Sequence, residues 1–289
     1  MYQIANETLT VHVAAKGAEI QSVFHTKTQL EYMWNADPAF WSKKSPVLFP
    51  IVGGLKNNTY EYAGKKYTLN RHGFARESVF TVTEKTNNSI TFSLGYNKKS
   101  LLVYPFHFRF SITYRLDDNQ LSVTYLVENV GNELMYFSVG AHPAFAVPLV
   151  QGTEFNDHYL KFNKWENSGK WPLSSEGLIE KESTAFFENS DSLPLSKELF
   201  YKDALVFKKI NSNAISILNH KNKHGLELSF ENFPYLGIWS AKNADFVCIE
   251  PWCGIADSVN SSRNIVEKEG INSIESNGVF TRKWSVRVF

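Results

Sequence analysis

The sequence is short of cysteine, of net charge and of long apolar runs, and each shortage excludes a class of protein. Only two cysteines occur among 289 residues, Cys248 and Cys253. Their spacing matches neither a CxxC redox motif nor a four-ligand zinc pattern, so we expect buried free thiols in a reducing compartment. The 30 basic and 29 acidic residues nearly cancel, and no basic stripe indicates a nucleic-acid surface. A small neutral or singly charged ligand fits this balance better.

No apolar run reaches the roughly 18 residues that a membrane-spanning helix needs. The N-terminal stretch MYQIANETLTVHV also lacks the basic and then apolar regions of a secretion signal. We therefore expect a cytoplasmic protein that has neither a membrane partner nor a nucleic-acid partner.

Long helical periodicity is missing as well. Two short stretches, DPAFWS at 37–42 and LSKELF at 195–200, are each compatible with one or two helical turns. No longer segment repeats its apolar residues with the helical period, which argues against a βαβ architecture. No short repeat and no Pro- or Gly-rich linker divides the chain, so we expect a single domain over residues 1–289.

The sequence does contain alternation of apolar and polar residues with a period of two, which is typical of strands with one buried face. The alternating runs lie at 8–15, 79–85, 89–96, 108–116, 121–129, 135–141, 214–220, 225–232 and 284–289. Turn-forming residues separate them, and the Asp117–Asn119 turn joins two clear runs, which predicts a hairpin there. These patterns predict one large antiparallel β-sandwich, with its site on loops and strand faces of one concavity.

Aromatic residues are abundant, at 15% of the chain, with 22 Phe, 13 Tyr and 7 Trp. Most of them are expected in a β-rich core, because aromatic side chains favour strands. A few can line a pocket that stacks against flat apolar faces, such as those of sugar rings.

Three stretches far apart in the chain carry residues suited to acid–base chemistry. They are RHGFAR with His72, VGAHPAFAVP with His142 and CIEPWCGIADS with Glu250. Distant strands of a β-sandwich can converge on one pocket, so the separation in sequence does not exclude a common site. Each residue also has a purely structural interpretation, as part of a packed turn or of a buried ion pair.

The two histidines differ from the others in the residues that follow them. Gly73 permits close backbone approach after His72, and Pro143 constrains the chain after His142. Such residues determine where a side chain points, although they also occur in plain turns. Glu250 lies in the apolar run FVCIEPW, where burial raises the pKa of a carboxyl and makes it a better base near neutral pH. The alternative is a glutamate paired with a nearby Arg or Lys.

Together these stretches resemble the aldose 1-epimerases, or galactose mutarotase-like proteins, over nearly the whole chain. The similarity runs from NETLTVHVAAKGAEIQSV through FPIVGGLKNNTYEYAGKKYTLNRHGFAR and YPFHFRFSITYRL to GAHPAFAVP, FPYLGIWS and CIEPWCGIADS. RHGFAR and GAHPAF look like the divergent bacterial branch called galactose mutarotase-related. The order and spacing of the motifs carry the resemblance, since no single one is as specific as a metal signature.

This resemblance implies an all-β fold, an antiparallel β-supersandwich, and an isomerase that uses no cofactor and no metal. It implies that Glu250 is the general base that takes the proton from the anomeric hydroxyl, and that His142 is the general acid that protonates the ring oxygen. His72 matches the family's second histidine, which hydrogen-bonds near the ring and anomeric oxygens. The C1–O5 bond opens, C1 rotates, and the ring closes with the opposite anomeric configuration.

The residues expected to bind the sugar are Arg71, Arg76, Asp203, Trp239 and Trp252. Asp203 lies where the family often has an Asp that accepts hydrogen bonds from sugar hydroxyls. The two arginines can donate to hydroxyls or to a phosphate. The two tryptophans can supply an apolar face, with core packing as the alternative.

One departure from the family's pattern is Gly54 in PIVGGLKNN, where relatives usually have an arginine. A donor to the sugar is missing there, unless Arg71 replaces it. The leading hypothesis is an aldose 1-epimerase that acts on a hexose such as galactose. The alternatives are a hexose-6-phosphate mutarotase that uses Arg71, Arg76 or Lys56, and a sugar-binding or regulatory β-sandwich without turnover. The resemblance is compatible with a monomer or a homodimer.

Overall fold

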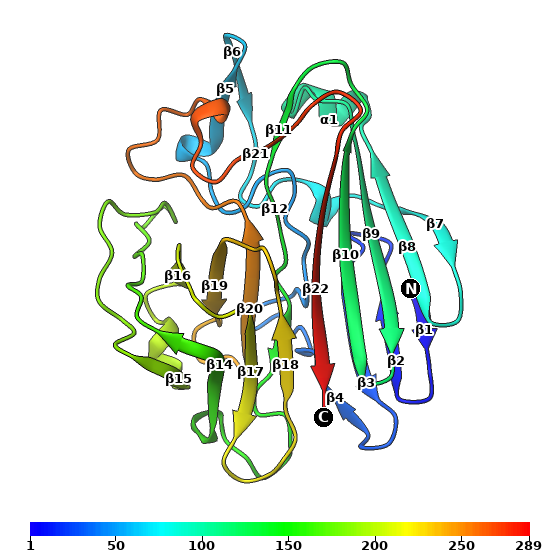
Figure 1. The fold of residues 1–289 in the computed structure, drawn as a ribbon, viewed down its shortest axis with the longest axis vertical. Coiled ribbons are helices and arrows are strands. Elements are labelled where there is room, and N and C mark those ends of the chain that lie inside the picture. The colour runs from blue at the N-terminus through cyan, green and yellow to red at the C-terminus, as the bar shows by residue number, and fades with distance from the viewer.

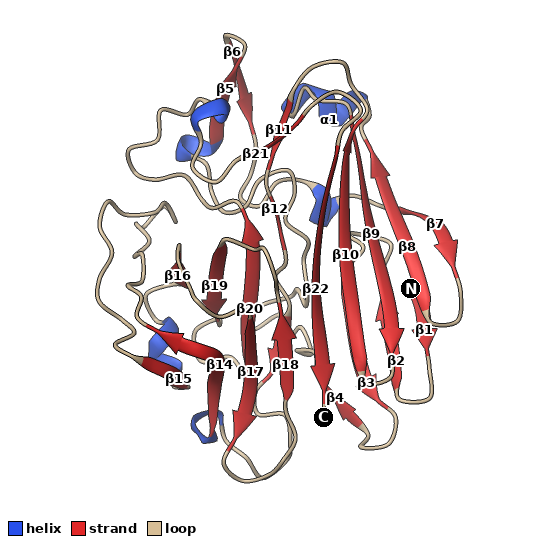
Figure 2. Cartoon of the chain, in the orientation of Figure 1, coloured by secondary structure: helices blue, strands red, loops and turns tan.

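The computed structural model describes residues 1–289, whose regular secondary structure is mostly antiparallel strand (Figure 1, Figure 2). The largest sheet has nine strands in the order β15-β14-β17-β18-β22-β10-β9-β8-β7. In that order their bounds are Ser190–Pro194, His158–Glu166, Ala214–Asn219, Leu226–Ser229, Val279–Val288, Gln120–Asn129, Phe108–Asp117, Ser89–Gly95 and Thr81–Lys85. This sheet forms one layer of the molecule.

Two smaller sheets form the second layer. One has the order β1-β2-β3-β4, with bounds Tyr2–Ala5, Leu9–Val13, Ile20–His25 and Leu30–Glu31. The other has the order β12-β20-β19-β16, with β13 also paired to β20, and bounds Val139–Gly140, Phe246–Cys253, Tyr235–Trp239, Leu205–Phe207 and Ala144–Ala146. Backbone hydrogen bonds from Trp34 to Ala144 and from Ala146 to Tyr32 join the two sheets at their edges.

The main core lies between these layers, as a cluster of 56 buried side chains. Strand β9 illustrates how the sequence builds it. Its residues alternate between buried and at least partly exposed positions, and Phe108, Phe110 and Ile112 all point into the cluster. Burial of large apolar side chains of this kind stabilises a fold by about 1.5–3 kcal/mol each. The predicted all-β, antiparallel β-supersandwich is confirmed.

Every alternating run of the sequence corresponds to a strand or, at 135–141, to the successive strands β11 (Met135–Phe137) and β12. The predicted hairpin is confirmed, because Asp117 and Gln120 pair across the turn between β9 and β10. The remaining strands are β5 (Thr59–Tyr62) with β6 (Lys65–Thr68), and β21 (Asn272–Ile274), which pairs with β11.

Helices are few and short. LSKELF contains the 3-10 helix η4 (Lys197–Phe200), as predicted, but DPAFWS is a turn in which the Asp37 carbonyl accepts two backbone N–H groups. The only α-helix is α1 (Lys98–Val103), which the sequence analysis missed and which Asn97 caps. The other 3-10 helices are η1 (Lys56–Asn58), η2 (Ala75–Glu77), η3 (Phe155–Asp157) and η5 (Ile265–Glu267). None of these helices has the length and apolar character to cross a membrane.

Strand β20 is buried on both faces and determines where the candidate site lies. Successive side chains of a strand point to opposite faces. Val247 and Ile249 accordingly belong to the main core, whereas Glu250 and Trp252 line a pocket on the other face.

Candidate active site

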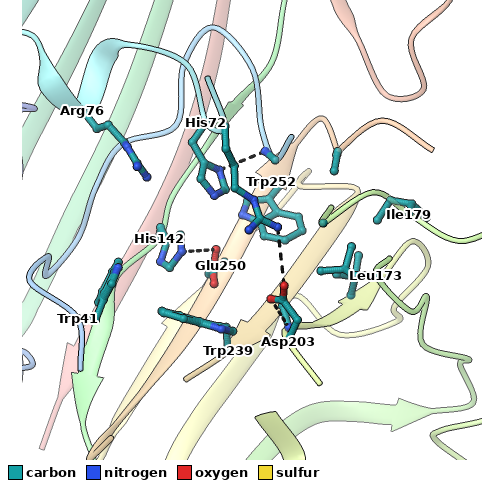
Figure 3. A pocket seen from close by; sticks show the side chains of 16 residues that line it. Trp41, His72, Arg76, His142, Leu173, Ile179, Asp203, Trp239, Glu250 and Trp252 are labelled. Carbon is teal, nitrogen blue, oxygen red and sulfur yellow. Dashed lines mark hydrogen bonds and ion pairs between the residues drawn. The ribbon is translucent and has the colours of Figure 1, made fainter. Parts of the chain in front are cut away.

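A pocket of about 370 Å³ brings together every residue that the sequence predicted for the site (Figure 3). These residues are Glu250, His142, His72, Arg71, Arg76, Asp203, Trp239 and Trp252. The volume falls within the range of about 300–1,000 Å³ that is usual for small-molecule sites. Strands β19 and β20 supply the tryptophans and the glutamate, Arg76 lies in η2, and the other residues come from loops.

The carboxylate of Glu250 and the imidazole of His142 are in direct contact in this pocket. His142 Nε2 lies 3.3 Å from Glu250 Oε2, and the two residues are 8% and 2% exposed (Figure 3). Burial raises the pKa of Glu250 well above its ordinary value, since the charged form loses its solvation. The positive charge of Arg71 opposes this rise, and the negative charge of Asp203 adds to it.

Glu250 differs from the other buried glutamates in what surrounds its carboxylate. Glu19 and Glu166 each accept two backbone N–H bonds, at 2.7–3.0 Å. No backbone N–H donates to Glu250. The Trp252 indole N–H, which is buried and has no partner of good hydrogen-bond geometry, lies near enough to lower the pKa of this carboxyl. A buried carboxyl with so few hydrogen-bond donors around it is costly, so stability does not explain Glu250.

Aromatic rings surround His142. The Trp41 ring stacks on the imidazole at a centroid distance of 5.0 Å, and the Trp239 ring meets it edge-on at 5.6 Å. Burial among these rings, opposed by a hydrogen bond to its own backbone and assisted by the charges of Arg76 and Arg71, lowers the pKa of His142 to about 3. Its Nδ1 is buried and has no partner on another residue, so Nε2 is the atom available to Glu250 and to a ligand.

His72 is held by its own backbone and by Gly53. The Gly53 N–H donates to His72 Nδ1 at 3.1 Å, and the His72 N–H donates to the Gly53 carbonyl at 2.9 Å. Because a backbone N–H can only donate, Nδ1 accepts, and the neutral ring carries its proton on Nε2. Burial first, then His142 and the two arginines, holds the pKa of His72 well below its ordinary value. His72 therefore presents a neutral N–H donor.

Both His72 and the following Gly73 have left-handed backbone angles, with φ of 69° and 70°. A Cβ on Gly73 would lie 2.4 Å from the carbonyl oxygen of Phe49. Glycine is therefore required for the close approach that the sequence predicted at this turn. The turn brings the His72 ring to a centroid distance of 5.7 Å from His142.

The two arginines of RHGFAR differ in whether they have an ion-pair partner. Arg71 Nη2 lies 3.9 Å from Asp203 Oδ2, at the limit of an ion pair, and Asp203 Oδ1 also accepts the N–H of Ala204. Arg76 is half-buried and makes no hydrogen bond or ion pair, and burial lowers its pKa. The pocket thus contains a guanidinium whose donors are free for a ligand.

Trp252 lies flat along the sheet because both neighbouring strands have a glycine beside it. An added Cβ would come within 2.7 Å of the indole at Gly140 on β12 and within 2.4 Å at Gly237 on β19. Trp252 is only 6% exposed, so it serves mainly as the packed floor of the pocket. Trp239 is half-buried and packs edge-on against Trp41.

Part of the pocket wall lies outside the residues that the sequence predicts for the site. Trp41 lies in DPAFWS, whose pattern indicates only a short helical stretch, and its aromatic side chain is the one signal of a role in the pocket. Leu173, Gly177 and Ile179 come from a segment without strand periodicity, and no local pattern marks them. The pocket also includes Gly53, Ala204, Val206 and Ala256.

Two other expectations concern residues at the edge of this region. A Cβ on Gly54 would have no atom closer than 3.9 Å, so the backbone leaves room for a side chain to begin there. Lys56 does not line the pocket, because its ammonium donates to the Val259 carbonyl at 2.8 Å.

The arrangement supplies a carboxyl–imidazole pair that can exchange a proton, an additional N–H donor, free guanidinium donors and flat apolar walls. Comparisons with known proteins show the family to which the chain belongs. The family described as aldose 1-epimerase matches residues 1–275. The protein LacX of Lactococcus lactis subsp. lactis is 34% identical over 281 residues, which is 94% of each chain.

Solved structures give the same result. A galactose mutarotase related enzyme from Lactobacillus acidophilus is 37% identical, with a TM-score of 0.96 over 100% of this chain and 97% of that one. A galactose mutarotase-like protein from Lactobacillus casei is 28% identical, with a TM-score of 0.93 over all of both chains. The sequence match and the shared fold extend over nearly the full length, and the chain belongs to the aldose 1-epimerase family.

Proposed function

We propose that this protein is an aldose 1-epimerase that interconverts the α and β anomers of a hexose by general acid and base catalysis. The observation that carries the proposal is the contact between Glu250 and His142. A buried carboxyl without backbone donors lies 3.3 Å from an imidazole, in a pocket walled by tryptophans. Family membership supports a mutarotase-type activity. The reaction needs no cofactor, and the two free thiols fit the reducing cytoplasm.

In the proposed reaction the Glu250 carboxylate removes the proton from the anomeric hydroxyl of the sugar. The C1–O5 bond breaks as C1=O1 forms, and O5 receives a proton from His142 Nε2. Rotation about the C1–C2 bond presents the other face of the aldehyde. On ring closure O5 attacks C1 and returns its proton to His142, while O1 takes the proton from Glu250. The pair holds one proton before and after the reaction.

Before a sugar binds, burial favours the form in which this shared proton is on the carboxyl. Burial raises the pKa of Glu250 and lowers that of His142, so each group favours its neutral form. No backbone N–H of the protein donates to Glu250, and the hydroxyls of a bound sugar supply hydrogen-bond donors in their place. They favour the carboxylate, with the proton on His142, which is the state that opens the ring. His72 Nε2–H then donates to the ring oxygen or to O1.

A second candidate substrate is a hexose 6-phosphate, and Arg76 is the observation that favours it. A half-buried guanidinium without a partner is suited to an anion, because charge-assisted hydrogen bonds to phosphate are strong. Arg71 lies in the same pocket and is only weakly paired with Asp203. Lys56 is excluded from this role by its bond to Val259.

The test is polarimetry on freshly dissolved α-anomers of glucose, galactose and glucose 6-phosphate. We expect acceleration by the wild-type protein and its loss in Glu250→Gln. The control is Glu19→Gln, a buried glutamate outside the pocket, which we expect to retain turnover. The ratio of rates for free and phosphorylated sugars decides between the two substrate classes. Sugar binding without acceleration of any anomer would instead indicate a binding protein.

A further inference from the structure

Strand β20 carries a third potential metal ligand beside the acid–base pair. The Sγ of Cys248, a ring nitrogen of His142 and a carboxylate oxygen of Glu250 all lie within 4.8 Å of one another. All three residues are buried, and Cys248 is 0% exposed. Cys248 precedes Glu250 by two positions, so the two side chains project from the same face of the strand.

The thiol of Cys248 is unusual in having no hydrogen-bond partner. It packs in a small cluster of apolar residues that includes Trp34 and Phe246, separate from the main core. The only other cysteine, Cys253, lies on the opposite face of the same strand, in the main core, and its Sγ contacts the Asn232 carbonyl at 3.7 Å. The chain therefore contains its own control, a second buried thiol on β20 that is remote from the His142–Glu250 pair.

The three donors match one class of ligand. A thiolate, an imidazole and a carboxylate form a donor set that Zn²⁺ uses, with bonds of about 2.0–2.3 Å in tetrahedral geometry. Such bonds separate the donor atoms by roughly 3.3–3.6 Å. The 3.3 Å between His142 and Glu250 already has this spacing. With all three donor atoms within 4.8 Å of one another, the sulfur needs to approach by no more than about 1.5 Å to reach this spacing.

We propose that Cys248, His142 and Glu250 together bind a thiophilic divalent cation of the Zn²⁺ class at the edge of the pocket. The thiol proton leaves to solvent when the sulfur binds the ion. Three protein ligands leave a fourth position that faces the pocket, as in zinc sites that retain an exchangeable ligand. The ion uses the lone pairs of Glu250 and His142 that the proposed reaction needs for its protons. Occupancy by the cation and mutarotation therefore exclude each other.

The first test is a titration of metal-free protein with Cd²⁺, followed by the ultraviolet charge-transfer absorption of a cadmium–thiolate bond. Cys253→Ala leaves Cys248 as the only thiol, and we expect it to bind one Cd²⁺ per chain with the full absorption of the wild type. Cys248→Ala is expected to lose the absorption and to bind Cd²⁺ at least tenfold more weakly. Absence of the band in Cys253→Ala, or its persistence in Cys248→Ala, would overturn the proposal.

The second test is the ratio of mutarotation rates with and without Zn²⁺, measured within each variant. We expect Zn²⁺ to inhibit the wild type and Cys253→Ala, and chelator to reverse the inhibition. In Cys248→Ala the half-inhibiting Zn²⁺ concentration is expected to rise at least tenfold. Equal inhibition of all three proteins would assign the effect to other histidines and contradict the proposal. Since the Cd²⁺ titration uses no sugar, its result stands apart from that of the proposed function.

Discussion

His142 Nε2 and Glu250 Oε2 lie 3.3 Å apart, and burial moves the pKa values of the two groups in opposite directions. An ion pair on a surface favours the charged forms of both partners. In this pair the neutral carboxyl and the neutral imidazole are favoured, because both groups are buried away from water and no backbone N–H donates to the carboxyl. Two groups whose environments push their pKa values past each other can exchange a proton with a substrate at neutral pH.

Glu250→Gln keeps the size of the side chain and removes its capacity to accept a proton. We expect kcat for mutarotation to fall by about 10²–10⁴-fold, the contribution of one positioned acid–base group. Glu19→Gln should retain turnover and lose about 1 kcal/mol of stability, because its charge-assisted hydrogen bonds to backbone N–H become neutral. Polarimetry and urea unfolding measure the two effects. A similar loss of turnover in both variants would contradict a specific role for Glu250.

The substitution Glu250→Gln is also expected to stabilise the fold at neutral pH. The folded chain holds the Glu250 proton more tightly than the unfolded chain, whose glutamate has an ordinary pKa of 4.5. The wild type therefore loses stability as the pH rises from that value toward the folded pKa. Glu250→Gln carries no such proton, so its Tm advantage should grow across this window and exceed about 3 °C at neutral pH, roughly 1 kcal/mol.

Titration of His142 makes the stability of the fold change with pH in the opposite direction, at lower pH. Its pKa falls from 6.5 to about 3 on folding, so the unfolded chain binds the proton more tightly and stability is lost as the pH drops below 6.5. Calorimetry of metal-free wild type, Glu250→Gln and His142→Asn from pH 3 to 8 separates the two slopes. A Tm difference between wild type and Glu250→Gln that does not vary with pH would show that burial does not shift the Glu250 titration.

Gly73→Ala should disturb both the fold and the position of His72. Gly73 and Gly64 have nearly the same φ, 70° and 72°, but an added Cβ lies 2.4 Å from the Phe49 carbonyl at Gly73 and meets nothing within 4 Å at Gly64. We expect Gly64→Ala to cost about 1 kcal/mol from the backbone angle alone, and Gly73→Ala at least about 2 kcal/mol more. Only Gly73→Ala should also lower kcat. Equal unfolding midpoints would show that the turn relaxes around the added methyl.

Arg76→Met tests what the free guanidinium binds. A charge-assisted hydrogen bond is worth about 1.5–3 kcal/mol, so we expect KM for a hexose 6-phosphate to rise at least about tenfold. For the free hexose the expected change is smaller than about threefold, because that sugar offers no anion to Arg76. Steady-state kinetics with both sugars measure the difference. Equal increases would show that Arg76 contacts hydroxyls of the hexose.

The sequence predicted several strands that have one face in the core and one at least partly exposed, such as β9 and β10, but it missed β14, which has a similar burial pattern. It did not reveal β19 and β20 as strands, because alternation disappears when both faces are covered. The residues of β20 were recognised only as an apolar run around Glu250. Strands with two buried faces are distinguishable from other apolar segments only once their neighbours are known.

The candidate site likewise contains residues that the sequence predicts and residues that it does not. His72, His142 and Glu250 stand in motifs whose order resembles the family, and the structure places them in one pocket. Trp41 and the segment 173–179 reach the same pocket through tertiary contacts. The stacking of Trp41 on His142 depends on residues about a hundred positions apart, and no local pattern records it.

Strand β20 has a consequence for how such a site can change over evolution. Its two faces belong to different structures, since Val247 and Ile249 pack in the main core while Glu250 and Trp252 form the pocket. A substitution that shifts β20 to suit another sugar also disturbs the main core. The pocket face of the strand cannot move without a change in the packing on its other face. Sugar preference is therefore freer to diverge through Trp41 and the segment 173–179, which border the pocket without belonging to the core of the sandwich.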